Sequence, residues 1–388
     1  MARPSEPKRR RPKRAERATK TSVRTKAPAR SRPSRAAAAE PLTASRKDSH
    51  IEIVLHEDVA HKTVANGFER YRFDHEALPE MDLADVDLSI ELLGKRLAAP
   101  LVIGAMTGGT ERSRRINRHL AEAAQASRVA LALGSARAVL ENPARARTYA
   151  VRDVAPDVLV FANLGAVQLR LGVTPDDCRR LVDLLEADAL NLHLNPLQEV
   201  VQPEGDTTFG GLGDRIAAVA RALAPTPVLV KEVGSGISAA TAAILRTTGI
   251  AGIEVAGAGG TSWALIESHR GGNPAKARLG RVFADWGIPT AESLIQVRES
   301  WPDGVVIASG GIRDGIESAK ALALGATAVA SAFPFLAGAE RSAEAVVERI
   351  GLFVEELRTA CFLTRSRTIA DLRQARLRRI GPLTRDQP

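Results

Sequence analysis

The stretch LVIGAMTGGT at residues 101–110 places a short, continuous apolar run directly before a group of glycines and small polar residues. An apolar run without alternation indicates a strand that is buried on both faces, as in a parallel sheet covered by helices. Seven further runs of this kind follow. The eight runs are 101–105, 129–133, 158–162, 189–194, 228–231, 250–256, 305–309 and 327–330. Eight successive strand–helix units predict an α/β protein with a closed (β/α)8 TIM barrel rather than an open doubly wound sheet.

The stretches between the runs carry the helical period. Residues 117–126 place apolar and small side chains on one side, and residues 318–324 end at Gly325, a plausible helix C-cap. About fifty residues separate the sixth and seventh runs. We therefore expect an insertion near residues 271–285 to form a lid or loop over the barrel mouth.

Charge is distributed unevenly along the 388 residues. Residues 1–45 hold 14 Lys or Arg against 3 Glu, a net charge of +11, so residues 46–388 carry −2 of the formal total of +9. With almost no large apolar residue, the first 45 residues are expected to form a disordered basic tail. Such a tail could adhere weakly to nucleic acid or an anionic membrane, but we favour a solvated extension without a specific partner. Residues 46–388 then form the barrel domain, in which residues 46–100 make an N-terminal cap.

The composition is that of a soluble globular protein, with 45% hydrophobic and 26% charged residues. No stretch of about 18 apolar residues suggests a membrane span. Cys178 and Cys361 form no CxxC motif, which indicates neither a disulfide framework nor a thiolate zinc site. The tail lacks the apolar segment of a secretory signal. We expect a reducing, cytoplasmic setting.

The carboxyl ends of the eight runs concentrate polar residues, which is where a barrel carries its active site. These ends read GAMTGGT, GSAR, ANLGAVQ, HLNPLQE, KEVGSG, AGAGGTSW, ASGGIRDG and SAFPF. The seventh and eighth ends occupy the position where barrels often bind a phosphate through backbone N–H groups and a helix N-terminus. Gly257, Gly259, Gly260 and Thr261 would extend that cradle. Alternatively, Gly310 and Gly311 only shape a tight turn. No GxGxxG motif follows a strand, so a Rossmann site is not supported.

Lys231 ends the fifth run and would point into the barrel mouth, where a buried ammonium needs an anion. A flavin fits, because its N1/O2 edge becomes negative on reduction. Pairing with Glu232 or Glu254 is the alternative. Asn163, Ser135 and Thr107 are candidates for hydrogen bonds to the flavin ring and ribityl chain.

The segment NLHLNPLQE at residues 191–199 offers neutral polar groups beside a single carboxylate, Glu199. One carboxylate suits a Mg²⁺ that is held mostly by substrate phosphates and water, although Glu199 could equally be a helix-start charge. Arg46, Lys47 and Arg137 are cations available for a diphosphate. Arg46 and Lys47 could instead simply end the basic tail.

In combination, these motifs resemble type 2 isopentenyl-diphosphate isomerases from Arg46 to about residue 355. The matching signatures, in chain order, are RKDSHI, NGFERYRFDHEALPE, APLVIGAMTGGT, INRHLAEAA, GSAR, NLGAVQL, HLNPLQE, VKEVGSGIS, GGTSW, DWGIPTAESL and ASGGIRDG. The basic tail and the Arg-rich C-terminus DLRQARLRRIGPLTRDQP fall outside the family pattern.

The resemblance implies an FMN enzyme that interconverts isopentenyl and dimethylallyl diphosphate with Mg²⁺, uses NADPH to reduce its flavin, and assembles as a homo-oligomer, a tetramer or octamer. It implies substrate contacts from Arg46, Lys47, Ser135, Arg137, His193, Asn195 and Gln198, with Gln198 and His193 as the catalytic candidates and Glu199 as the Mg²⁺ ligand. It implies FMN contacts from Ala105, Met106, Thr107, Gly108, Ser135, Asn163, Lys231, Thr261, Gly310, Gly311, Arg313, Ala332 and Phe333.

Three other functions compete. An FMN-dependent 2-hydroxy acid oxidoreductase needs a basic histidine after the sixth strand, but AGAGGTSW has none and His269 comes only later. A protein similar to inosine-monophosphate dehydrogenase needs a nucleophilic cysteine on a loop, and neither cysteine is suitably placed. A noncatalytic nucleic-acid-binding module would act through the tail and bind no flavin.

Overall fold

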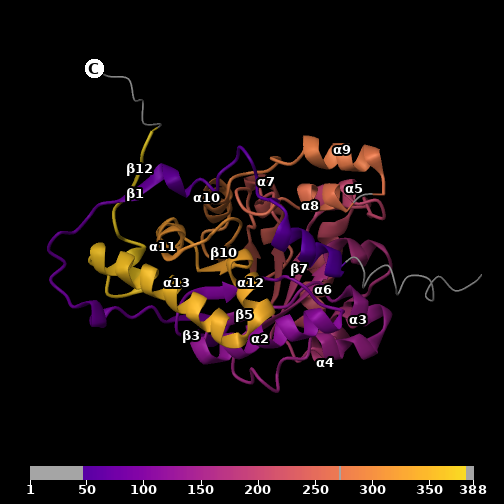
Figure 1. Ribbon diagram of the computed structural model, residues 1–388, viewed down its shortest axis with the longest axis horizontal. Helices are drawn as coiled ribbons and strands as arrows, with labels where there is room; N and C mark the ends of the chain where they lie inside the picture. The colour runs from indigo at the N-terminus through magenta and orange to yellow at the C-terminus, as the bar shows by residue number, and fades with distance from the viewer. Residues whose placement is uncertain (1–46, 271, 382–388) are drawn as a thin grey trace, which may run out of the picture.

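A computed structural model describes residues 47–270 and 272–381, so the expected tail and Arg46 lie outside the described residues. Eight parallel strands close into a barrel in the order β10-β11-β4-β5-β6-β7-β8-β9 (Figure 1). The strands are β4 (Leu101–Ile103), β5 (Ala130–Ala132), β6 (Val160–Gly165), β7 (Ala189–His193), β8 (Val228–Lys231), β9 (Gly252–Glu254), β10 (Val305–Ala308) and β11 (Ala328–Ser331). Each overlaps one of the eight apolar runs, which confirms the predicted (β/α)8 fold.

Helices follow the strands and surround the barrel. They are α2 (Glu111–Ser127), α3 (Arg137–Glu141), α4 (Pro175–Leu184), α5 (Pro196–Val201), α6 (Leu212–Leu223), α7 (Ala239–Arg246), α8 (Trp263–His269), α9 (Pro274–Val282), α10 (Thr290–Ser300), α11 (Gly315–Ala323), α12 (Phe333–Arg341), α13 (Ala343–Leu363) and α14 (Ile369–Leu372). Helix α2 starts where the Thr110 side chain accepts a hydrogen bond from the Ser113 N–H. Helix α11 is followed by Gly325 at φ 103°, the C-terminal glycine that the sequence predicts.

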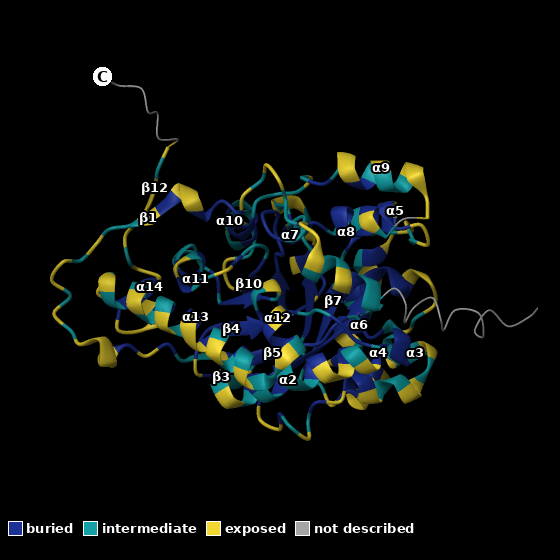
Figure 2. Ribbon diagram, viewed as in Figure 1, coloured by how far each residue is buried: buried dark blue, intermediate teal, exposed yellow. Residues whose placement is uncertain are grey.

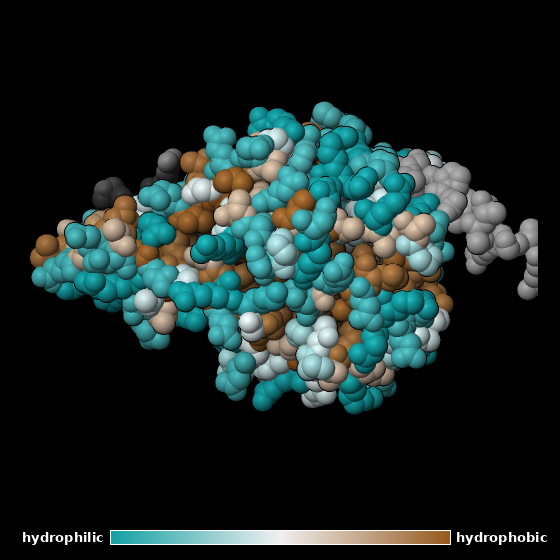
Figure 3. All heavy atoms as spheres, turned by 90° about the horizontal axis from the view of Figure 1, so that it is seen from below, coloured by the Kyte–Doolittle hydropathy of each residue, from teal (hydrophilic) through white to brown (hydrophobic). Residues whose placement is uncertain are grey.

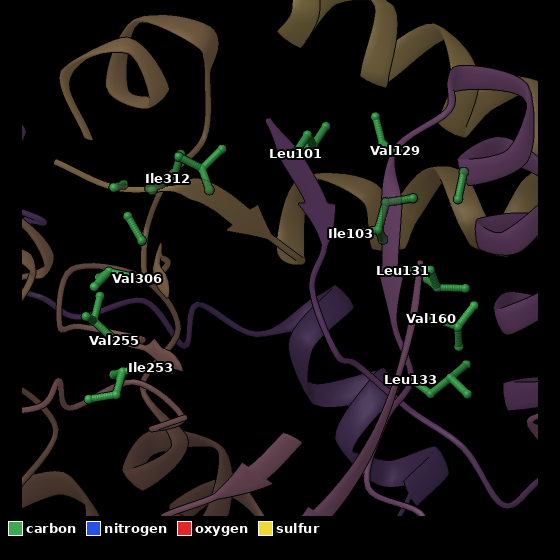
Figure 4. Close-up of a cluster of buried hydrophobic side chains, with 14 of the residues drawn as sticks. Leu101, Ile103, Val129, Leu131, Leu133, Val160, Ile253, Val255, Val306 and Ile312 are labelled. Carbon is green, nitrogen blue, oxygen red and sulfur yellow. The ribbon is translucent and has the colours of Figure 1, made fainter. Parts of the chain in front are cut away.

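Alternate side chains of the short strands enter two different apolar layers. Leu101 and Ile103 of β4 point outward, toward the helices, together with the other labelled residues of Figure 4. Val102 lies in the barrel interior with residues such as Phe161 and Ile307. Figure 2 shows the resulting pattern, in which the strands are buried and the helices expose only their outer faces.

Residues 47–100, which the sequence predicts as a cap, are distributed around the barrel. Residues 47–56 form a helix at the cavity described below, whereas the hairpin of β2 (Ile90–Leu92) and β3 (Lys95–Leu97) contributes Leu92 and Leu97 to the barrel interior. Hairpin and helix therefore serve different parts of the fold. Short 3-10 helices complete the connections, at Phe68–Arg70, Leu83–Asp85, Pro143–Thr148 and Ala166–Arg170.

The prediction of a lid or loop over the barrel mouth near residues 271–285 is not met by the described residues 272–285. Helix α9 packs on α8 and α5, and no residue of 272–285 lines the cavity. The helix at residues 47–56 lies there instead. It is held by a hydrogen bond of 2.8 Å from Thr110 Oγ1 to Asp48 Oδ1 and by an ion pair between Arg112 and Glu52. The insertion secures the cap from outside, because the Asp285 carboxylate accepts hydrogen bonds from the Lys62 and Thr63 N–H groups.

The Arg-rich C-terminal segment pairs with the acidic part of the cap. Strand β12 (Leu377–Arg379) runs antiparallel to β1 (Tyr71–Phe73), away from the barrel (Figure 1). Ion pairs continue the contact on both sides of this pair, and they join Arg365 to Glu80, Arg367 to Asp85, and Arg376 and Arg378 to Asp74. Arg376 and Arg378 of this segment thus have an acidic partner in the protein itself, as do Arg365 and Arg367 just before it.

Large apolar side chains are exposed at scattered positions. Leu78, Ile316 and Leu352 are 71%, 53% and 52% exposed, and Figure 3 shows hydrophobic groups among hydrophilic ones on the face seen from below. Among residues 47–270 and 272–381, no helix is both long and apolar enough to cross a bilayer.

Candidate active site

A cavity of about 560 Å³ opens at the carboxyl ends of the barrel strands. Its wall contains nearly all the predicted site residues, namely Lys47, Ala105, Met106, Thr107, Ser135, Arg137, Asn163, His193, Asn195, Gln198, Glu199, Lys231, Thr261, Gly310, Gly311, Arg313, Ala332 and Phe333. Gly108 lies outside the wall. A Cβ at this position would stand 1.9 Å from Cε1 of Tyr149, so Gly108 makes room for that ring. Residues from all eight strand ends and from the cap helix therefore meet at one place.

The turn after β10 presents unused backbone donors to this cavity. Within the described part of the chain, the N–H groups of Gly310, Gly311 and Ile312 have no acceptor. Helix α12, which follows β11, begins without a side-chain cap; Pro334 has no N–H and the Phe335 N–H donates to the Ala332 carbonyl oxygen, so the Phe333 N–H is the one left without an acceptor among the described residues at this helix start. Gly310 and Gly311 are half-buried and Ile312 is buried, so these donors call for a partner. These two adjacent ends are suited to hold an anion such as a phosphate.

Close packing also requires the glycines of this turn. Gly310 and Gly311 have φ of 103° and 75°, and a Cβ on either would approach within 2.5 Å of the carbonyl oxygen of Gly257 or Gly259. Gly310 and Gly311 are therefore also needed to form this tight turn. This role is compatible with a phosphate site, because the two glycine loops pack edge to edge and leave their donors unpaired.

Lys231 is buried among polar partners. Its Nζ donates to the Glu232 carbonyl oxygen at 2.6 Å and lies 3.5 Å from Glu254 Oε1, which also accepts from Ser309 Oγ at 2.9 Å. The alternative pairing with Glu254 is therefore present. Lys231 still lines the cavity, so the ammonium can serve both Glu254 and a bound anion.

The carboxylate of Glu232 forms no ion pair with the Lys231 ammonium. Its Oε2 accepts the N–H groups of Val233, Gly234 and Ser235 and so fixes the turn after β8. Burial raises the pKa of Glu232 to about 7, although these hydrogen bonds and Lys231 oppose the shift.

His193 is held in one orientation at the end of β7. Its Nδ1 lies 2.8 Å from Asn163 Oδ1 on the neighbouring strand β6. Burial, followed by the charges of Lys231 and Lys47, lowers the pKa of His193 to about 3, so the imidazole is neutral near pH 7. Because an amide oxygen only accepts, Nδ1 carries the proton and Nε2 is left as an acceptor.

A row of hydrogen-bonded side chains begins just after His193. Asn195 Nδ2 donates to Glu199 Oε1 at 2.9 Å and to Gln198 Oε1 at 3.1 Å, and Gln198 Nε2 donates to Glu267 Oε1 at 2.9 Å. Glu199 Oε2 also accepts the Asp206 N–H. The buried Oδ1 of Asn195 has no partner in the described residues. Asn195 thus offers an unpaired amide oxygen, and the neighbouring Glu199 a carboxylate whose two oxygens accept hydrogen bonds from Asn195 and the Asp206 N–H.

Glu267 was missed by the sequence reasoning. It is 3% exposed on α8, where His50 Nε2 lies 3.2 Å from its Oε1 and Arg270 Nη1 donates to its Oε2 at 2.6 Å. Burial alone would raise the pKa of Glu267, but the contact with His50 and the hydrogen bonds from Gln198 and Arg270 hold it at about 2. Burial lowers the pKa of His50. The signal that could have revealed Glu267 is a carboxylate placed directly after the apolar residues 263–266.

The arrangement differs from that expected of a 2-hydroxy acid oxidoreductase. His269 is exposed at the end of α8 and does not line the cavity. The histidines of the cavity wall are His50, His56 and His193. The basic histidine that such an enzyme needs after the sixth strand is therefore absent from this part of the described chain. Nor do the described residues contain a cluster of three His, Cys, Asp or Glu side chains that could bind a metal unaided.

Solved structures with a similar fold include mandelate oxidases. One that holds a monooxide FMN adduct aligns with a TM-score of 0.62 at 21% identity, over 88% of this chain and 100% of that chain. Another, with 2-hydroxy-phenylacetamide, aligns with a TM-score of 0.61 at 20% identity, over 89% and 98%. This likeness concerns the fold. Residues 203–379 also match the family described as FMN-dependent dehydrogenase.

Curated relatives are far more similar in sequence. An isopentenyl-diphosphate delta-isomerase of Nostoc sp. is 50% identical over 86% of this chain and 95% of its own length. Those of Synechococcus sp. and Stutzerimonas stutzeri are 52% and 51% identical over 87% and 86% of this chain, and over 97% and 96% of their own lengths. This protein is accordingly an enzyme with a (β/α)8 barrel, and its chain belongs to the isopentenyl-diphosphate delta-isomerase family.

Proposed function

We propose that the protein interconverts isopentenyl diphosphate and dimethylallyl diphosphate, with reduced FMN and Mg²⁺. The observation that carries this proposal is the meeting of two different sets of groups in one cavity. One set is the unpaired N–H groups after β10, and the other is the row from His193 to Glu199. The first set suits a cofactor phosphate, and the second suits a metal-bound diphosphate.

The residues present fit FMN. The turn at Gly310 and Gly311 and the uncapped start of α12 would hold its phosphate, while Lys231 would face the N1/O2 edge of the ring. Asn163 and Ser135 would contact the ring or the ribityl chain. When bound and reduced, FMN supplies proton chemistry that ordinary side-chain acids perform poorly on an unactivated alkene.

Glu199 and Asn195 fit Mg²⁺ only in company with the substrate. They offer one carboxylate and one unpaired amide oxygen, and Mg²⁺ in such sites keeps water and phosphate oxygens for its other positions. Lys47 and Arg137 on the same wall would bind the remaining diphosphate charge. Arg46 precedes Lys47 directly and would assist.

His193 and Gln198 would orient the five-carbon part of the substrate. The neutral imidazole of His193 offers an acceptor at Nε2, so it can hold a donor without adding positive charge beside an electron-poor carbon. Gln198 is fixed on both sides of its amide, by Asn195 and by Glu267. Such fixed groups lower the entropic cost of reaching a reactive geometry.

The proposal also covers the reductant of the flavin, the oligomeric state and the location of the enzyme. NADPH would reduce the flavin, and the enzyme would act as a homo-oligomer, a tetramer or octamer, in the cytoplasm. The basic tail is proposed to have no specific nucleic-acid partner.

Purified protein tests the proposal directly. It should bind FMN and turn yellow, bleach with NADPH under anaerobic conditions, and then convert isopentenyl diphosphate only when Mg²⁺ is supplied. Omitting the reductant and omitting Mg²⁺ are the two matched controls. Protein that binds no FMN, or that converts the substrate equally well without a reductant, would refute the proposed chemistry.

A further inference from the structure

The cap motif NGFERY, residues 66–71, contacts the turn after β10. About 245 residues of sequence separate the two partners. Asn66 Nδ2 donates to the Gly311 carbonyl oxygen at 2.9 Å and to Glu317 Oε1 at 2.7 Å. Asn66 is only 5% exposed. In Figure 1 the indigo cap segment passes beside α10 and α11, which are the helices on either side of this turn in sequence. The site residues so far described leave this contact without a role.

A second donor reaches the same turn from α10. Thr290 Oγ1 donates to the Gly310 carbonyl oxygen at 2.5 Å, and it also lies 3.2 Å from the carbonyl oxygen of Ser309. Thr290 is fully buried. Two side chains from separate segments thus hold the carbonyl groups of two successive peptides.

Peptide geometry turns these contacts into an orientation of the donors. A trans peptide points its C=O and the N–H of the next residue in opposite directions. With the Gly310 carbonyl on Thr290, the Gly311 N–H must point away from Thr290. With the Gly311 carbonyl on Asn66, the Ile312 N–H must point away from Asn66. These are two of the N–H groups that have no acceptor among the described residues.

Glu317 completes the arrangement on the far side of the turn. Its Oε2 accepts the Arg313 N–H at 2.8 Å, and its Oε1 accepts from Asn66. The Arg313 N–H is thereby occupied, so the donors left unpaired are those of the three preceding residues. Asn66 is itself fixed, because its Oδ1 accepts the Phe68 N–H and its carbonyl accepts the Ala291 N–H.

We propose that Asn66 and Thr290 are positioning residues that orient the Gly310–Ile312 N–H groups for the phosphate of FMN. This inference rests on the proposed function, since it takes FMN as the ligand. It assigns a role to the cap motif, none of whose residues is itself a predicted ligand contact. The two side chains act before the cofactor arrives, by preventing the carbonyl groups from turning toward the anion.

The test compares FMN with riboflavin, which lacks the phosphate. In Asn66→Ala, the Kd of FMN should rise on the order of tenfold, the effect of losing about one or two hydrogen bonds. The Kd of riboflavin should stay within about twofold, because the ring site is not changed. Thr290→Val, which keeps the side-chain shape, should show the same selective loss. It also provides the measurement should Asn66→Ala fail to fold.

Asp285→Ala is the matched control. Asp285 holds the same cap segment at Lys62 and Thr63 but does not touch the turn. Its removal should leave the ratio of the two Kd values as in the parent protein. The inference is overturned if the Kd of FMN and that of riboflavin rise by the same factor, if neither changes, or if Asp285→Ala reproduces the selective loss. Parent protein that binds riboflavin but gains nothing from the phosphate would instead refute the proposed FMN site.

Discussion

Gln198 Nε2 donates to Glu267 Oε1 at 2.9 Å, so a carboxylate from α8 sets the orientation of an amide that begins on α5. Because that carboxylate stays ionised, with a pKa of about 2, the amide must present its N–H₂ to Glu267 and its oxygen to Asn195. The arrangement defines which atom of Gln198 faces which neighbour.

Glu267→Gln removes the charge that fixes this amide. A charge-assisted hydrogen bond contributes about 1.5–3 kcal/mol, so kcat/KM should fall roughly tenfold to a hundredfold while the Kd of FMN stays unchanged. Steady-state kinetics with the reduced enzyme measures the first and fluorescence titration the second. Glu204→Gln is the control, because Glu204 binds the same Arg270 from the outside without reaching Gln198. Equal losses in both variants would assign the effect to Arg270.

Glu199→Gln should shift the requirement for Mg²⁺. With the single carboxylate neutralised, half-maximal activity should need on the order of tenfold more Mg²⁺, because anionic oxygen is the preferred ligand of this cation. FMN binding should be unaffected. Activity measured against Mg²⁺ concentration gives the answer, and an unchanged Mg²⁺ curve would remove Glu199 from the metal site.

Substitutions of Lys231 and Glu254 should shift the midpoint potential of the bound flavin in opposite directions. Replacing the cation by Lys231→Met disfavours the anionic reduced ring, so the midpoint potential should fall by about 30 mV, equivalent to about 1.4 kcal/mol for a two-electron couple. Glu254→Gln removes the opposing charge and should raise the potential. The double variant, which leaves no unpaired buried charge, should lie between them. Spectroscopic redox titration decides, and shifts of the same sign would exclude a role for this pair.

Glu232 should make stability depend on pH. Its folded pKa of about 7 exceeds the ordinary value of 4.5, so the folded protein retains a proton that the unfolded chain has lost. The free energy of unfolding should therefore decrease as pH rises from about 4.5 to about 7, by at most about 3 kcal/mol. Glu232→Gln cannot titrate and should flatten this dependence. Urea unfolding of both proteins at pH 5 and pH 8 provides the comparison, and parallel curves would contradict the assignment.

The barrel was predictable because its signal is local. Each strand shows as a continuous apolar run, and each run ends in residues whose chemistry suits the mouth of a barrel, as at Lys231 and His193. The site residues followed from those ends. Glu267 was not predictable in this way, since it lies on the inner side of α8, where an apolar run hides a carboxylate that only tertiary contacts can explain. The same applies to Asn66, whose partner is about 245 residues away in sequence.

The lid expectation was not met by residues 272–285, for a related reason. A long gap between strands indicates extra structure, but nothing in the gap itself says where that structure packs. Helix α9 lies on α5 and α8, and the helix at residues 47–56 is held beside the cavity by Asp48 and Glu52, whose partners follow β4. Placement of this kind depends on contacts between distant segments, which one sequence does not reveal.

The pairing of β1 with β12 has a consequence for synthesis on the ribosome. Residues 71–73 emerge early, yet their strand partner, residues 377–379, is translated long after them. The acidic cap segment must therefore remain without its arginine partners until those residues have been synthesised. Docking of this segment waits for them, and a nascent chain stalled before residue 365 should leave it open to protease.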